Sequence, residues 1–128
     1  PRSTLFPYTT LFRSIDDLGT KHLKILWDPA NALYCGEDPS MDTFNSMSGG
    51  YLGHIHMKDV NVAIHQASIK CVALGKGQMA PYLSQIAEKI REMDYKGAIS
   101  LESVYRPKNG NFEDGFHSSI TLFKELFS

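Results

Sequence analysis

Short apolar runs alternate along the chain with longer stretches of helical periodicity, from Ile15 onward. Brief apolar runs bounded by glycine and polar residues are typical of buried strands. They predict strands over residues 23–27, 51–57 and 98–101, with Gly97 at the turn into the third. Strands that alternate with helices indicate βα units feeding a parallel sheet.

The helical pattern is strongest between the second and third predicted strands. Charged residues there lie opposite one apolar stripe. The stripe consists of Leu83, Ile86, Ala87, Ile90 and Met93. A final helix is predicted with Asn111 as N-cap and one aromatic and aliphatic face, comprising Phe116, Ile120, Phe123 and Phe127. We expect a weaker helix between residues 40 and 47, an earlier helix ended by Gly19, and a polar loop after Met57.

A polar residue stands at or near the end of each predicted strand: Asp28, His56 and Glu102. Strand side chains alternate, so these three are expected on one side of the sheet. The apolar residues expected on the other side, against helices, are Leu23, Ile25, Trp27, Ile55, Met57, Ile99 and Leu101. Catalytic groups of parallel α/β sheets gather at the carboxyl ends of strands, which is where the polar residues fall.

Composition narrows the class of protein. The chain has 128 residues, 42% of them hydrophobic, and a formal net charge of −1, with dispersed basic residues, so a nucleic-acid surface is not indicated. An apolar run long enough to span a membrane is missing from the sequence. Cys35 and Cys71 lack metal-knuckle spacing. We expect a cytoplasmic protein with buried or inert thiols that acts on small molecules.

The first fourteen residues differ from the rest. They contain no acid, amide or glycine, and show neither clean helical nor clean strand periodicity. Residues 4–14, TLFPYTTLFRS, resemble the translation of a short-read sequencing adapter. We therefore interpret residues 1–14 as a non-native segment, exclude them from fold reasoning, and expect the native part, residues 15–128, to begin mid-gene.

An aspartate, a histidine and a glutamate that converge form an oxygen and nitrogen ligand set for a divalent ion such as Mn²⁺, Mg²⁺, Co²⁺ or Zn²⁺. Each has an ordinary alternative. Asp28 precedes a proline and could form a turn, His56 could be a satisfied polar residue, and Glu102 could simply face solvent. Spacing alone leaves both interpretations open.

Four sequence blocks carry a family resemblance: WDPAN from Trp27, HIHMKDV from His54, ALGKGQM from Ala73 and YKGAISLE from Tyr95. In this order they resemble the sugar phosphate isomerase/epimerase superfamily, the xylose isomerase-like TIM barrels. The resemblance covers essentially all of residues 15–128. It implies an α/β fold made of the C-terminal three βα units of a (β/α)8 TIM barrel, incomplete against the ~250 residues of that fold.

The resemblance also implies a site. Members hold one divalent metal ion with Glu, Asp, His and Glu at four strand ends; three correspond to Asp28, His56 and Glu102, and the fourth would lie upstream. Glu102 would be both a metal ligand and the catalytic base, moving a proton beside a carbonyl through an enediolate. Gly75 and Gly77 are expected to permit a tight turn.

Four further residues are expected to bind substrate. His54 shares the face of His56 one layer deeper, where a hydrogen-bonding role is expected. Asn31 stands where many epimerases carry a histidine, and its amide could bond a sugar hydroxyl. Lys58 could hold an anionic or carbonyl group, and Arg106 could clamp a phosphate or carboxylate.

The resemblance predicts a metal-dependent isomerase or epimerase of a sugar or sugar derivative, with a small sugar or polyol as its partner. An inosose-type dehydratase is the alternative within the class, because such members carry the Lys58–Asp59 pair. A DNA-repair AP endonuclease-like phosphodiesterase is the alternative of another class, although it would need a histidine at Asn31 and a basic groove. The fragment alone is expected to be inactive, because an incomplete barrel leaves an open sheet edge.

Overall fold

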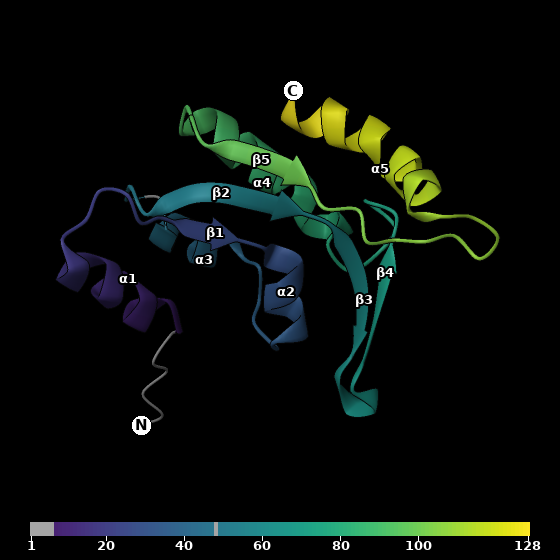
Figure 1. Ribbon diagram of the computed structural model, residues 1–128, viewed down its shortest axis with the longest axis horizontal. Coiled ribbons are helices and arrows are strands. Elements are labelled where there is room, and N and C mark those ends of the chain that lie inside the picture. Colours follow the sequence, from purple (N-terminus) through teal and green to yellow (C-terminus); the bar gives the residue numbers. More distant parts are fainter. Residues whose placement is uncertain (1–6, 48) are drawn as a thin grey trace.

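The computed structural model describes residues 7–47 and 49–128, and the side chains of residues 7–11 lie outside the description. The elements in chain order are α1 (Pro7–Leu18), β1 (Ile25–Trp27), α2 (Pro29–Tyr34), α3 (Met41–Met47), β2 (Leu52–Met57), β3 (Asp59–Ala63), a 3₁₀ turn η1 (Ile64–Gln66), β4 (Ser68–Val72), α4 (Ala80–Glu92), β5 (Ala98–Leu101) and α5 (Phe112–Phe127). Helices and strands alternate over most of the chain, as the sequence pattern predicts (Figure 1).

The three predicted strands form one parallel sheet in the order β1-β2-β5. The register pairs Trp27 with Ile55 and Met57 with Leu101, so the carboxyl ends of the three strands lie together. Parallel strands joined by helices confirm the α/β class. The described residues form this three-stranded sheet and a separate two-stranded one, and they do not close into a barrel.

One face of the parallel sheet carries the core. Ile25, Trp27, Ile55 and Met57 are buried, and Figure 1 places α3 and α4 behind this sheet. The intervening Leu26 is 50% exposed, as strand alternation requires. Leu23 is an exception to the prediction: β1 begins only at Ile25, and Leu23 lies before it, 44% exposed.

The predicted helices are present. The stripe of α4 is buried at Leu83, Ile86, Ala87 and Ile90. Asn111 caps α5 in a reciprocal capping box with Asp114, which confirms the expected N-cap. α1 ends before Gly19, whose φ of +58° favours glycine.

α1 extends back to Pro7, into the segment that the sequence pattern set aside. Within that segment the Phe12 ring lies 4.8 Å from the Tyr51 ring, and Tyr51 also donates a hydrogen bond of 3.0 Å to Asp16. The helix therefore packs where the chain enters β2. Its helical backbone includes residues whose sequence shows no clean periodicity.

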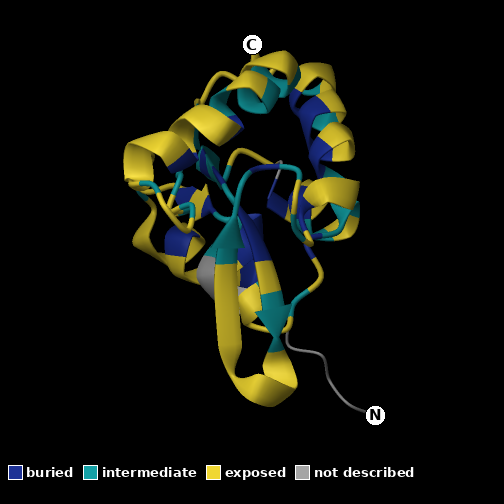
Figure 2. Ribbon diagram, turned by 90° about the vertical axis from the view of Figure 1, so that its right-hand side faces the viewer, coloured by how far each residue is buried: buried dark blue, intermediate teal, exposed yellow. Residues whose placement is uncertain are grey.

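Two parts of the chain differ from the prediction. The expected polar loop after Met57 is wrong: β3 and β4 pair there as an antiparallel hairpin from Asp59↔Val72 to Ala63↔Ser68. The hairpin projects from the body and is largely exposed toward its turn (Figure 2). The six-residue helix α2 was not predicted either, because it is too short to display helical periodicity.

The two cysteines are free thiols, as expected, but Cys35 is exposed rather than buried, and Cys71 is partly buried. No helix within residues 7–47 and 49–128 is long and apolar enough to cross a bilayer.

Candidate metal centre

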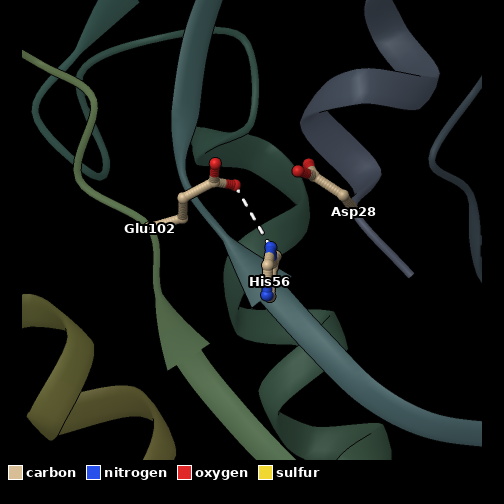
Figure 3. A group of neighbouring side chains, drawn as sticks. All are labelled: Asp28, His56 and Glu102. Carbon is tan, nitrogen blue, oxygen red and sulfur yellow. Dashed lines mark hydrogen bonds and ion pairs between the residues drawn. The ribbon is translucent and has the colours of Figure 1, made fainter. Parts of the chain in front are cut away.

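The three polar residues predicted at the strand ends lie together. Asp28 follows β1, His56 is in β2 beside Ser100, and Glu102 follows β5, its N–H donating to the carbonyl of Met57 at 2.9 Å. One ligand atom from each of Asp28, His56 and Glu102 lies within 4.8 Å of the others (Figure 3). The parallel register brings the three strand ends to one edge of the sheet, and the alternation of side chains along each strand puts the three polar groups on one face. Together these two constraints explain the convergence.

Asp28 has a structural task as well. It is the N-cap of α2, with an extended backbone (φ −126°), and its Oδ1 accepts the Asn31 N–H at 3.1 Å. Pro29 stands at the start of the helix, where a backbone N–H would have no partner within the helix, and proline has no N–H to leave unpaired. The turn-forming alternative is therefore true of Asp28, and it is compatible with the metal-ligand hypothesis: capping uses one carboxylate oxygen and directs the other into the cluster.

The two histidines lie edge to face, with ring centroids 4.7 Å apart and planes at 85°. His56 Nδ1 lies 3.2 Å from Glu102 Oε2, the contact marked in Figure 3. His54 Nε2 lies 2.9 Å from Ser100 Oγ. His54 therefore has the hydrogen-bonding position expected of it, while its role toward a substrate stays a prediction.

Lys58 lies at the centre of the cluster. Its Nζ is 2.7 Å from Asp28 Oδ2 and 2.9 Å from Glu102 Oε2, and its side chain is only 10% exposed. Burial lowers the pKa of Lys58, but hydrogen bonds and attraction from both carboxylates outweigh burial and raise the pKa above its ordinary value. Lys58 is therefore an ammonium at neutral pH.

Glu102 is the more open of the two carboxylates, with 36% of its side chain exposed against 7% for Asp28. Burial raises the pKa of Glu102, yet the hydrogen bond and charge of Lys58, followed by contributions from Asp28 and His56, bring the pKa below its ordinary value. The glutamate is thus ionised at neutral pH and able to accept a proton or bind a cation.

Of the two exposed residues predicted to bind substrate, Asn31 adjoins the cluster and Arg106 is held in a separate loop. Asn31 is exposed in the first turn of α2, bound to Asp28 through its backbone. Arg106 is also exposed, and its Nε donates to the carbonyl of Gly110 at 2.9 Å. The structure thus places Arg106 in its own loop, and the substrate roles of both residues stay predictions.

The structural role of Asp59 was not predicted from the sequence, where the residue was noted only as part of the Lys58–Asp59 pair. Asp59 is 1% exposed, and its two carboxylate oxygens accept four backbone N–H bonds: Val60 at 2.8 Å, and Met79, Gly75 and Gly77 at 2.9 Å each. Asp59 therefore fastens the HIHMKDV block to the ALGKGQM block. The sequence signal for this role was the pair of glycines, Gly75 and Gly77, whose expected function was only to permit a turn.

The two glycines serve different purposes in this loop. Gly75 has φ +80°, which confirms the expected turn. Gly77 instead permits close approach: a Cβ there would meet Asp59 Oδ1 and lie 2.6 Å from the Val60 carbonyl. Gln78 adds to the attachment, because its side chain pairs with the Val62 N–H and carbonyl at 2.9 and 3.2 Å.

The donor chemistry of the cluster suits a divalent cation. Two carboxylates and an imidazole offer hard oxygen and borderline nitrogen ligands without a thiolate. The ammonium of Lys58 already lies between the two carboxylates, as a positive charge drawn to them. The cluster therefore attracts a cation by charge and offers ligands of the right type.

Comparison with known proteins gives a family for the chain. The family model described as Xylose isomerase-like TIM barrel matches residues 8–126. A search of curated proteins found no match.

Proposed function

The chain belongs to the Xylose isomerase-like TIM barrel family, and from that premise we propose that its full-length parent is a metal-dependent isomerase or epimerase of a sugar or sugar derivative. The observation that carries the proposal is the meeting of Asp28, His56 and Glu102 at the carboxyl ends of three parallel strands. Active sites of TIM barrels are built at that face.

In this proposal Asp28, His56 and Glu102 hold one divalent ion, Mn²⁺, Mg²⁺, Co²⁺ or Zn²⁺. The ion would supply Lewis-acid stabilisation of charge on the substrate oxygens beside a carbonyl. Asp28 suits a fixed ligand, because its cap to Asn31 orients the carboxylate before any ion arrives.

Glu102 is the proposed general base. It is ionised, it is the more exposed carboxylate, and it stands one residue past the end of β5. A substrate above the sheet would present the proton beside its carbonyl to this carboxylate, leaving an enediolate. Returning the proton to the former carbonyl carbon, while a hydroxyl proton moves between the two oxygens, gives the isomer. Epimerisation needs a second acid on the opposite face of the substrate, and in this proposal the upstream glutamate of the family would supply that proton.

The remaining polar residues would hold the substrate. His54, bonded to Ser100, and Asn31, at the start of α2, offer neutral hydrogen-bonding groups for hydroxyls. Lys58 offers a positive charge for an anionic or carbonyl oxygen. Arg106 would need to leave the Gly110 carbonyl to clamp a phosphate or carboxylate.

A dehydratase of a cyclic polyol ketone is the second candidate, and Lys58 favours it. Its ammonium lies 2.9 Å from the proposed base, so an acid and a base stand side by side. Elimination of water needs both: the base removes the proton beside the carbonyl, and an acid protonates the departing hydroxyl.

The test uses the full-length parent with Mn²⁺ in D₂O, incubated with free and phosphorylated ketoses and with cyclic polyol ketones. An isomerase or epimerase introduces deuterium beside the carbonyl, observed by NMR, and forms the isomer; a dehydratase gives a product lighter by one water. Glu102→Gln should abolish exchange, whereas Glu113→Gln, an exposed glutamate in α5, should not. Deuterium exchange that survives Glu102→Gln contradicts the proposal.

A further inference from the structure

The centre of the cluster already holds a positive charge. Lys58 Nζ contacts Asp28 Oδ2 and Glu102 Oε2, the carboxylates that the proposed metal ion would share. Both contacts are short, and the lysine side chain is nearly enclosed, at 10% exposure. An ammonium in this position gives both carboxylates a positively charged partner without a metal ion.

Two cations on the same carboxylates would stand close together. A divalent transition ion binds carboxylate oxygen at about 2.1 Å. If it shared an oxygen that Lys58 contacts at 2.9 Å or less, the two positive charges would be less than about 5 Å apart. Repulsion over that distance in a partly buried site is large compared with the energy of a surface contact.

We infer that Lys58 is a resident counter-cation that competes with the divalent ion for Asp28 and Glu102, and that it moves away from them when the ion binds. The inference rests on the proposed function, because it takes these residues as metal ligands. It adds a sequence of events: the ion releases the ammonium, which then becomes available to a substrate oxygen at the mouth of the site.

The experiment measures Mn²⁺ binding to the 128-residue chain by electron paramagnetic resonance, with no substrate present. Lys58→Met removes the charge, and Lys58→Arg keeps it. Lys96→Met removes a charge from an exposed lysine that pairs with Asp94 instead. We expect Lys58→Met to bind Mn²⁺ about tenfold more tightly or better, and the Lys58→Arg and Lys96→Met proteins to stay within about threefold of the wild type.

A second measurement uses the wild-type chain, because Lys58→Met leaves two carboxylates without their partner and could impair folding. The Lys58 side-chain amine is observed by NMR during titration with Zn²⁺, its signal identified by its loss in Lys58→Arg. Release of Lys58 predicts a shift toward the position of exposed lysines and faster exchange of its protons with water.

The outcomes separate the two proposals. Equal Mn²⁺ affinity in the wild type and in Lys58→Met, or an unmoved Lys58 signal while Zn²⁺ binds, overturns the competition and leaves the metal centre intact. No binding of either ion to any variant overturns the metal centre, and the competition fails with it.

Discussion

The carboxylate of Asp59 and the backbone amide of Gly77 are joined by a hydrogen bond of 2.9 Å, 18 residues apart in sequence. This bond is one of four that Asp59 accepts from backbone N–H groups. Asp59 directly follows Lys58, and successive side chains of an extended chain point in opposite directions. The arrangement lets Lys58 face the cluster while Asp59 holds the loop behind it.

Replacing Asp59 should therefore destabilise the fold. Asp59→Asn exchanges one acceptor oxygen for an amide NH₂ group, a donor that would face N–H donors, so we expect a loss of about 2–4 kcal/mol in the free energy of unfolding. Asp17→Asn, an exposed site in α1, makes the same charge change and should cost less than about 0.5 kcal/mol. Urea denaturation measures both, and similar midpoints for the two variants would refute the role of Asp59.

Gly77→Ala should be destabilising for a steric reason. The added Cβ would collide with Asp59 and lie 2.6 Å from the Val60 carbonyl, which predicts a cost of about 2 kcal/mol or more. Gly49→Ala is the matched control, because a Cβ there would have its nearest contact at 3.7 Å, on the Tyr51 ring. Thermal unfolding of the two variants should differ, and equal midpoints would contradict the close approach.

Asp28 should show two separable functions. Asp28→Ser keeps an oxygen for the Asn31 N–H, whereas Asp28→Ala removes it, so the alanine variant should be about 1 kcal/mol less stable. Both lack the carboxylate and should bind Mn²⁺ at least about tenfold more weakly than the wild type. Binding of Mn²⁺ by Asp28→Ser at wild-type strength would exclude Asp28 as a ligand.

Stability should depend on pH through Tyr51. Its hydroxyl donates to Asp16, and this hydrogen bond, followed by burial and the charge of Asp16, raises the pKa of Tyr51 above 10.0. A raised pKa means that the stabilisation is fully present below pH 10.0 and is lost as pH rises through the folded-state value. Tyr51→Phe keeps a ring against Phe12 without the hydroxyl.

The melting temperature of the wild type should therefore fall more steeply than that of Tyr51→Phe on the alkaline side. Subtracting the curve of melting temperature against pH for Tyr51→Phe from that of the wild type cancels the contributions of the other tyrosines. Parallel curves throughout the alkaline range would show that the Asp16 contact does not stabilise the docking of α1.

The 128-residue chain alone should show no turnover, even with Mn²⁺ added. Its parallel sheet has three strands, whereas a closed barrel of this type has eight. The face that carries His54 and His56 also leaves Leu26 half exposed, so within the part of the chain that the structure describes this face is open to water. Turnover by the purified chain that disappears in Glu102→Gln would contradict this expectation.

Much of the fold follows from the sequence because strand parity is a strong constraint. Burial of Trp27 and Met57 and the convergence of Asp28 and Glu102 all follow from alternation and parallel order. The long helices α4 and α5 were equally readable, since each carries several turns of apolar periodicity.

The parts that were missed lack such a pattern. The hairpin of β3 and β4 is buried only at the adjacent residues Asp59 and Val60 and is exposed or half-buried beyond them, so a buried face does not alternate with a polar one. Asp59 binds backbone N–H groups, and the sequence signal at those partner positions was limited to Gly75 and Gly77, which were interpreted as a turn. The central place of Lys58 depends on two carboxylates from different strands, and so it became visible only once their distances were known.

Binding of Mn²⁺ to the wild-type chain and to His56→Ala, measured by electron paramagnetic resonance, tests the metal centre most directly. His117→Ala is the control, because that histidine is exposed in α5 and pairs only loosely with Glu113 at 3.8 Å. The account predicts one ion per chain, an affinity at least about tenfold weaker in His56→Ala, and no change in His117→Ala. Equal affinities in all three proteins would contradict it.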